Sequence, residues 1–140
     1  MPSPPHRDAN GKVIPHNHDE IGNQDFVIRH TDPRDLCPDG TGGKRLSSGA
    51  FTESSDGGMS VDIESWMIAD GLGQLHYVTD ASQGAVRLNV GELRKLGLKV
   101  GFDPDGGHQH HGSVWGLGGP KQRRRVAALA LTIKKAAGES

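Results

Sequence analysis

Three histidines stand within four positions of the stretch GGHQHHG, at His108, His110 and His111. Imidazole is the most common side-chain ligand of zinc, and it is also the usual general acid or base near neutral pH. The stretch runs directly into SVWGL, so the sequence predicts one strand over residues 108–117. Because residues i and i+2 share one face of a strand, His108 and His110 would point one way and His111 the other.

His108 and His110 are therefore the predicted metal ligands, since two imidazoles on one strand face can hold one divalent ion such as zinc. A zinc site needs a third protein ligand. The spacing selects none of the four side chains that could supply it: His30, His76, Asp103 and Asp105.

A second interpretation needs no metal. Arg29 and His30 end a predicted strand at residues 25–30, and Ser47 and Ser48 lie on the next predicted strand. If these strands adjoin the histidine strand, we expect Arg29 to hold an anion through its guanidinium fork and the two serines to orient it. The side chains predicted to act as catalytic acid or base are His30, His110 and His111. The alternative is a local role, in which the serines satisfy a strand edge and His30 pairs with a nearby aspartate.

The last part of the chain is basic. Residues 1–70 hold 6 Lys and Arg against 12 Asp and Glu, whereas residues 71–140 hold 10 against 5. Pro120 begins a predicted basic helix over residues 120–136, with an apolar stripe and four cations in its first turns: Lys121, Arg123, Arg124 and Arg125. Three interpretations stay open for these cations: solvation, contact with a protein partner, or contact with a nucleic acid.

Alternating and helical patterns divide the rest of the chain into short elements. Strands are predicted at residues 46–51, 59–61 and 98–102, and a hairpin at residues 75–89. Asp62 is a predicted cap for a helix that ends at Gly71, and Asn89 with Glu92 predicts a two-turn helix. The fold class predicted is α+β, with a mostly antiparallel sheet of six or seven short strands and three helices.

The 140 residues suggest three segments: a mobile N-terminal tail at 1–24, an α+β core domain at 25–117 and a basic C-terminal helix at 118–140. No run approaches the ~18 apolar residues of a membrane span, so no membrane partner is predicted. The N-terminus has no apolar stretch typical of a secretory signal, and the single cysteine, Cys37, excludes an internal disulfide. These features predict a reducing, cytoplasmic setting.

Three segments together resemble a loosely defined set of small bacterial proteins: RLSSGAF, MSVD and HQHHGSVWGL. That set shares an S-S-x-A-F segment, an L-S-V-D segment and a late H-x-H-x-x-G-like segment, and no settled activity attaches to it. Gly49 stands here in the variable place and Met59 replaces the leucine. The resemblance covers roughly residues 26–117, with gaps.

A fainter likeness is to ADP-ribosyltransferase-like folds, which place an Arg or His on an early strand and serines on the next, around an NAD pocket. Arg29 or His30 and the pair Ser47–Ser48 match those places, but His110 and His111 stand where those enzymes carry a late glutamate. The sequence thus leaves three functions open: a pocket that binds or processes a phosphate-bearing ligand (nucleotide or RNA), a non-enzymatic protein-interaction module, and a metal-binding protein.

Overall fold

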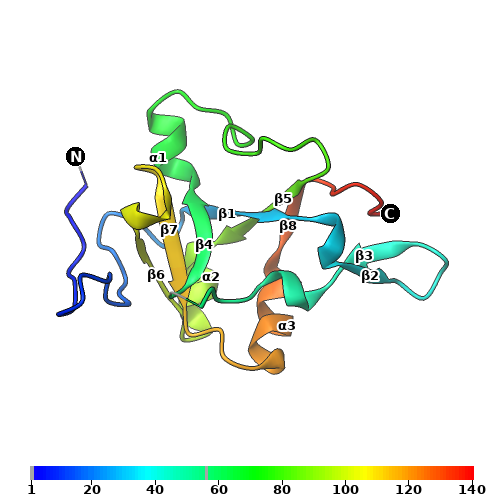
Figure 1. Cartoon of the computed structure of the whole chain (residues 1–140), viewed down its shortest axis with the longest axis horizontal. Helices are drawn as coiled ribbons and strands as arrows, with labels where there is room; N and C mark the ends of the chain where they lie inside the picture. The colour runs from blue at the N-terminus through cyan, green and yellow to red at the C-terminus, as the bar shows by residue number, and fades with distance from the viewer. Residues whose placement is uncertain (1, 56) are drawn as a thin grey trace.

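A computed structural model describes residues 2–55 and 57–140 of the chain. Its centre is one antiparallel sheet with the strand order β6-β7-β4-β1-β5-β8 (Figure 1). The strands of this sheet are β1 (Phe26–Thr31), β4 (Met59–Ile63), β5 (Gly84–Asn89), β6 (Lys99–Phe102), β7 (His111–Trp115) and β8 (Leu131–Lys134). The predicted α+β class with a mostly antiparallel sheet and three helices is confirmed.

The remaining elements surround this sheet. A small hairpin, β2 (Leu36–Pro38) and β3 (Lys44–Leu46), projects at the right of Figure 1. The helices are α1 (Glu64–Ala69), α2 (Val90–Lys95) and α3 (Pro120–Leu129). Three 3-10 turns complete the list: Pro33–Asp35, Ser48–Ala50 and Pro104–Gly106.

The two faces of the sheet differ in polarity because the strands alternate. In β4, Val61 and Ile63 lie in the main apolar core, whereas Ser60 and Asp62 point to the opposite face. A smaller apolar cluster around Ile28 covers part of that second face, with Tyr77 among the side chains packed on it. The rest of the second face carries polar side chains, and these include most of the candidate functional residues.

At two places where a strand was predicted, the described residues form turns instead, because local hydrogen bonds replace the pairing of an extended strand. The chain leaves β3 at Leu46, and the side-chain oxygen of Ser47 accepts the backbone N–H of Gly49 at 3.1 Å, which closes the 3-10 turn Ser48–Ala50. Residues 72–83 form turns instead of the first arm of a hairpin. The prediction of strands at residues 46–51 and 75–80 is therefore wrong.

The ends of two other elements also differ from the prediction. The helix predicted over 120–136 stops at Leu129, because the segment Leu131–Lys134, which contains the β-branched Thr132 and Ile133, pairs with β5 and covers its edge. The side chain of Asp62 makes no helix cap; α1 starts one residue later and Asp62 is a strand residue. The cap predicted for α2 is confirmed, since Oδ1 of Asn89 accepts the backbone N–H of Glu92 at 2.9 Å.

Residues 2–24 lie beside β6, the other edge strand (Figure 1). The backbone N–H of His18 donates to Val100 O, the side chain of Asn17 accepts the N–H of Val100, and Ile21 is buried in the main core. The N-terminal segment thus satisfies one sheet edge, while the C-terminal segment supplies the strand at the other edge.

Candidate functional site

Strand register brings the chemistry-bearing residues to one face of the sheet. Asp62 lies directly opposite Ile28 on β1 and opposite His111 on β7. Directly opposite residues of an antiparallel pair project from the same face, and His30 lies two positions after Ile28. The register therefore places Asp62, His111 and His30 on the second, polar face.

The carboxylate of Asp62 lies between two imidazoles. Its Oδ1 is 3.0 Å from Nε2 of His108, in a hydrogen bond, and its Oδ2 is 2.8 Å from Nε2 of His30. The second contact is short but lacks the alignment of a hydrogen bond. Nε2 of His30 and Oδ2 of Asp62, which are both buried, therefore have no hydrogen-bond partner. Buried polar atoms without partners are rare in folded proteins and concentrate at functional positions.

The proton positions on His108 follow from its neighbours. Its Nδ1 accepts the backbone N–H of His110 at 3.2 Å, so a neutral His108 carries its proton on Nε2 and donates it to Asp62. Its ring stacks on Tyr77 at 3.6 Å with an interplanar angle of 4°. Burial lowers the pKa of His108, and the charge of Asp62 opposes this shift only in part.

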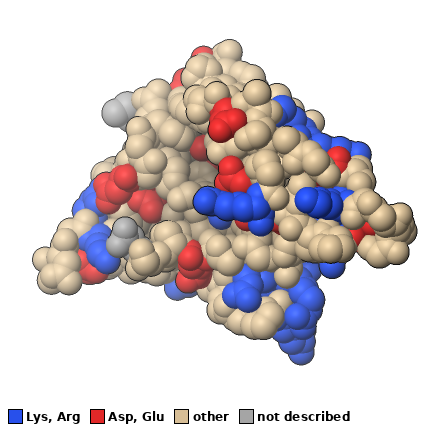
Figure 2. All heavy atoms as spheres, turned by 45° about the vertical axis from the view of Figure 1, so that its right-hand side comes forward, with Lys and Arg blue, Asp and Glu red and all other residues tan. Residues whose placement is uncertain are grey.

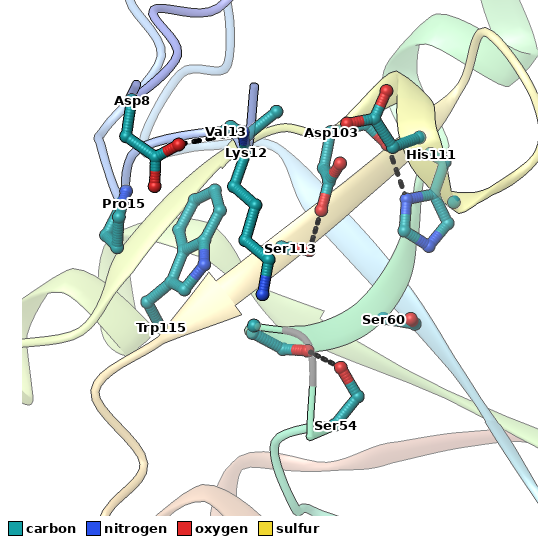
Figure 3. A pocket seen from close by; sticks show the side chains of 14 residues that line it. Asp8, Lys12, Val13, Pro15, Ser54, Ser60, Asp103, His111, Ser113 and Trp115 are labelled. Atoms are coloured by element: carbon teal, nitrogen blue, oxygen red, sulfur yellow. Dashed lines mark hydrogen bonds between the residues drawn. The ribbon is translucent and has the colours of Figure 1, made fainter. Parts of the chain in front are cut away.

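His111 is held in the opposite tautomer. Its Nδ1 donates to the carbonyl oxygen of Asp103 at 2.6 Å, which leaves Nε2 as the acceptor of a neutral ring (Figure 3). The backbone of Gly106 lies against this ring so closely that a Cβ at position 106 would overlap it. One carbonyl and one glycine thus fix both the tautomer and the orientation of His111.

His110 makes a separate chain of hydrogen bonds. Its Nε2 lies 2.6 Å from Oδ2 of Asp70, and its Nδ1 lies 2.6 Å from the hydroxyl of Tyr77. Burial raises the pKa of Tyr77, and the charges of Asp62 and Asp70 raise it further, so the phenol keeps its proton. His110 therefore positions Tyr77.

Arg29 closes a gap in the sheet. Strands β1 and β4 are paired only at Val27–Ile63 and Ile28–Asp62. Beyond this point Arg29 donates from Nε to Ala50 O at 3.1 Å and from Nη1 to Ser60 O at 3.0 Å. Burial lowers the pKa of its guanidinium, which nevertheless stays charged.

These side chains surround a hollow of about 280 Å³, which we call the histidine pocket. Its polar lining consists of Arg29, His30, Ser60, Asp62, Tyr77, His108 and His111. Of the residues predicted for a ligand site, Arg29, His30 and His111 meet here. Ser47 and Ser48 lie outside this lining, in their 3-10 turn.

The prediction that His108 and His110 share a strand face is wrong, because β7 begins only at His111. The 3-10 turn Pro104–Gly106 and the hydrogen bond from His111 N to His108 O curl the chain back before the strand. Each predicted metal ligand bonds its own carboxylate through Nε2, at Asp62 and Asp70. Among the described residues, no group of three or more His, Cys, Asp or Glu side chains could hold a metal ion.

Sequence reasoning missed three polar members of the histidine pocket: Ser60, Asp62 and Tyr77. The pattern MSVDI contained a signal, since apolar Met59, Val61 and Ile63 alternate with Ser60 and Asp62. Such alternation assigns Asp62 to the polar face of a strand. Tyr77 gave no comparable signal beyond its being the single tyrosine of the chain.

Comparison with known proteins assigns the chain to no family. The chain matches no protein-family model, no curated protein and no solved structure. In the described part of the chain, none of the helices has the length and apolar character needed to cross a bilayer. The functional interpretation therefore depends on the geometry of the histidine pocket.

Proposed function

We propose that the histidine pocket binds a phosphate-bearing ligand, such as a nucleotide or RNA, and that His111 exchanges protons with it. One observation carries this proposal: Arg29 and three imidazoles, those of His30, His108 and His111, line a single hollow. Guanidinium and imidazolium groups are donors to phosphate oxygens, and imidazole is suited to acid–base catalysis.

The charges of the pocket favour an anion as the pH falls. With neutral histidines the positive charge of Arg29 offsets the negative charge of Asp62, and each protonated imidazole then adds a positive charge. Nε of Arg29 and one N–H of its Nη1 donate to backbone carbonyls, which leaves the second N–H of Nη1 and both of Nη2 for a ligand. An anion bound here would raise the low pKa of His108 by stabilising its charged form.

The proposed roles follow from proton positions. Nε2 of His111 is the acceptor that can take a proton from a hydroxyl or a water. The phenol of Tyr77 donates its proton to Nδ1 of His110, so towards a ligand its hydroxyl oxygen can only accept.

Binding is tested with inorganic phosphate and 5′-AMP, followed by imidazole NMR signals and by calorimetry. We expect binding to the wild-type protein that strengthens from pH 8 to pH 6, and we expect His111→Gln and His30→Gln to weaken it about tenfold. His6→Gln is the matched control, since His6 is exposed and lies outside the pocket lining. Unchanged affinity in both pocket variants, or no binding of either probe, would refute the proposal.

A second candidate function is docking of an acidic protein surface on α3. Its cations form no ion pair with a carboxylate among the described residues, and Figure 2 shows Lys and Arg gathered on the lower part of the molecule, where α3 lies in Figure 1. Lys121, Arg124 and Arg125 are exposed. Replacing all three by Glu should abolish capture of an acidic partner without unfolding, whereas deleting residues 118–140 would remove β8 from the sheet.

A further inference from the structure

A second hollow adjoins the histidine pocket. It has a volume of about 500 Å³, and we call it the Lys12 pocket. The two hollows share three lining residues, Ser60, Gly106 and His111, so His111 stands at their boundary. A ligand that fills both hollows would therefore have a part on each side of the free Nε2 of His111.

The Lys12 pocket offers hydrogen-bond donors. In Figure 3 the side chain of Lys12 extends into the hollow, between the N-terminal segment and β4. Its ammonium group has no hydrogen-bond or ion-pair partner in the described part of the chain. The indole of Trp115 forms the wall beside it. These groups suit a ligand with oxygen or nitrogen acceptors.

Two carboxylates in the Lys12 pocket, those of Asp8 and Asp103, each keep one oxygen without a hydrogen-bond partner among the described residues. Asp105 binds Arg7 through both oxygens, at 2.6 and 3.1 Å, and Oδ1 of Asp8 accepts the backbone N–H groups of Asn10 and Lys12. Asp103 also engages one oxygen, Oδ2, which accepts the hydroxyl of buried Ser113 at 2.7 Å, and only Asp103 of the two is bonded to His111, through its backbone carbonyl. Its Oδ1 has no hydrogen-bond partner among the described residues.

We propose that the Lys12 pocket binds the base of a guanine nucleotide whose phosphate lies in the histidine pocket. Guanine presents the acceptors O6 and N7, which match the ammonium of Lys12, and the donors N1–H and N2–H, which match the carboxylate of Asp103. Adenine carries an acceptor at N1, which the carboxylate would repel, and uracil carries a single ring donor between two carbonyls. This inference depends on the proposed function, because it extends the ligand of the histidine pocket.

The contact between Asp103 and His111 links base recognition to proton transfer. The backbone carbonyl of Asp103 fixes the tautomer of His111, while its side chain faces the Lys12 pocket. A base held by Asp103 would therefore set the distance between the nucleotide and Nε2 of His111. Positioning of this kind is a large contribution to catalysis where reaction follows binding.

The test compares the binding of 5′-GMP, 5′-AMP, 5′-UMP and inorganic phosphate by calorimetry at pH 6.5. We expect GMP to bind the wild-type protein about tenfold more tightly than AMP or UMP. Asp103→Asn and Lys12→Gln should each reduce this preference to about twofold or less and leave the affinity for inorganic phosphate unchanged. Asp105→Asn, in the same pocket but engaged with Arg7, is the matched control and should keep the preference.

The two proposals fail in different ways. Equal affinities for the three nucleotides, with phosphate still bound, would overturn the guanine inference alone. The same holds if Asp103→Asn keeps the preference while thermal unfolding shows an intact fold. If neither phosphate nor any nucleotide binds, the proposed function fails as well.

Discussion

The backbone of Gly106 lies against the ring of His111, in the space that any larger residue at position 106 would need for its Cβ. The backbone at Gly106 does not require positive φ, so the requirement for glycine is steric. The short 3-10 turn that contains Gly106 therefore acts as a support for the imidazole that we propose as acid or base.

Gly106→Ala should displace the His111 ring and weaken the hydrogen bond from its Nδ1 to Asp103 O. We expect a shift of the His111 imidazole NMR signals and at least a threefold loss of phosphate affinity. Gly73→Ala is the matched control, because a Cβ at Gly73 meets no atom within 4 Å. Unchanged His111 signals in Gly106→Ala would contradict this packing.

Tyr77→Phe should destabilise the fold because it removes the hydroxyl that bonds Nδ1 of His110. His110 is 3 % exposed, so its nitrogen would be left buried without a partner, at a cost of about 1–3 kcal/mol. Phenylalanine keeps the ring that stacks on His108. Urea unfolding measures the loss, and a double-mutant cycle with His110→Leu should show coupling; additive effects would argue against the hydrogen bond.

Asp62→Asn should lower the pKa of His108 further, because it removes the negative charge that now opposes the effect of burial. The same change should lower the raised pKa of Tyr77, to which Asp62 contributes. NMR titration of both side chains checks the two directions. A rise in either pKa would show that Asp62 is not the charge that these groups sense.

The lowered pKa of His108 predicts a loss of stability in acid. The unfolded chain binds a proton at the usual value of 6.5, whereas the folded protein binds it only at lower pH. The free energy of unfolding should therefore fall as the pH drops below about 6.5 and stop falling, for this group, below the folded pKa. His108→Gln should flatten this part of the profile, and an unaltered slope would show that His108 does not cause it.

Glu64→Ala should be strongly destabilising. Glu64 is 5 % exposed and accepts both Nε and Nη2 of Arg87, at 2.9 and 2.7 Å, while the guanidinium lies 3.8 Å above the ring of Phe26. Removing one partner of a fully buried pair costs about 3–5 kcal/mol, and since the side chain of Arg87 is 30 % exposed and partly solvated, we expect a loss at or below the lower end of that range. Thermal unfolding measures this loss; the exposed pair Glu92–Lys95 provides the control, and Glu92→Ala should cost much less.

The sequence alone determined those parts of the molecule that depend on neighbouring residues. The strand at Phe26–Thr31, the capped helix after Asn89 and the fold class follow from side-chain alternation and from a side chain that bonds its own backbone three residues away. The same local logic identified Arg29, His30 and His111 as candidate residues. It failed where two local structures compete, as at Ser47, where a turn replaces the predicted strand.

Only the tertiary structure decided which of these residues meet. His30 and His108 are far apart in the sequence, and strand register together with the turn before His111 brings both to Asp62. Likewise, the open edge of β5 gives Leu131–Lys134 a partner and so ends the basic helix early. Strand register and edge pairing depend on which side chains the whole sheet can bury. They therefore cannot be predicted from a single stretch of sequence.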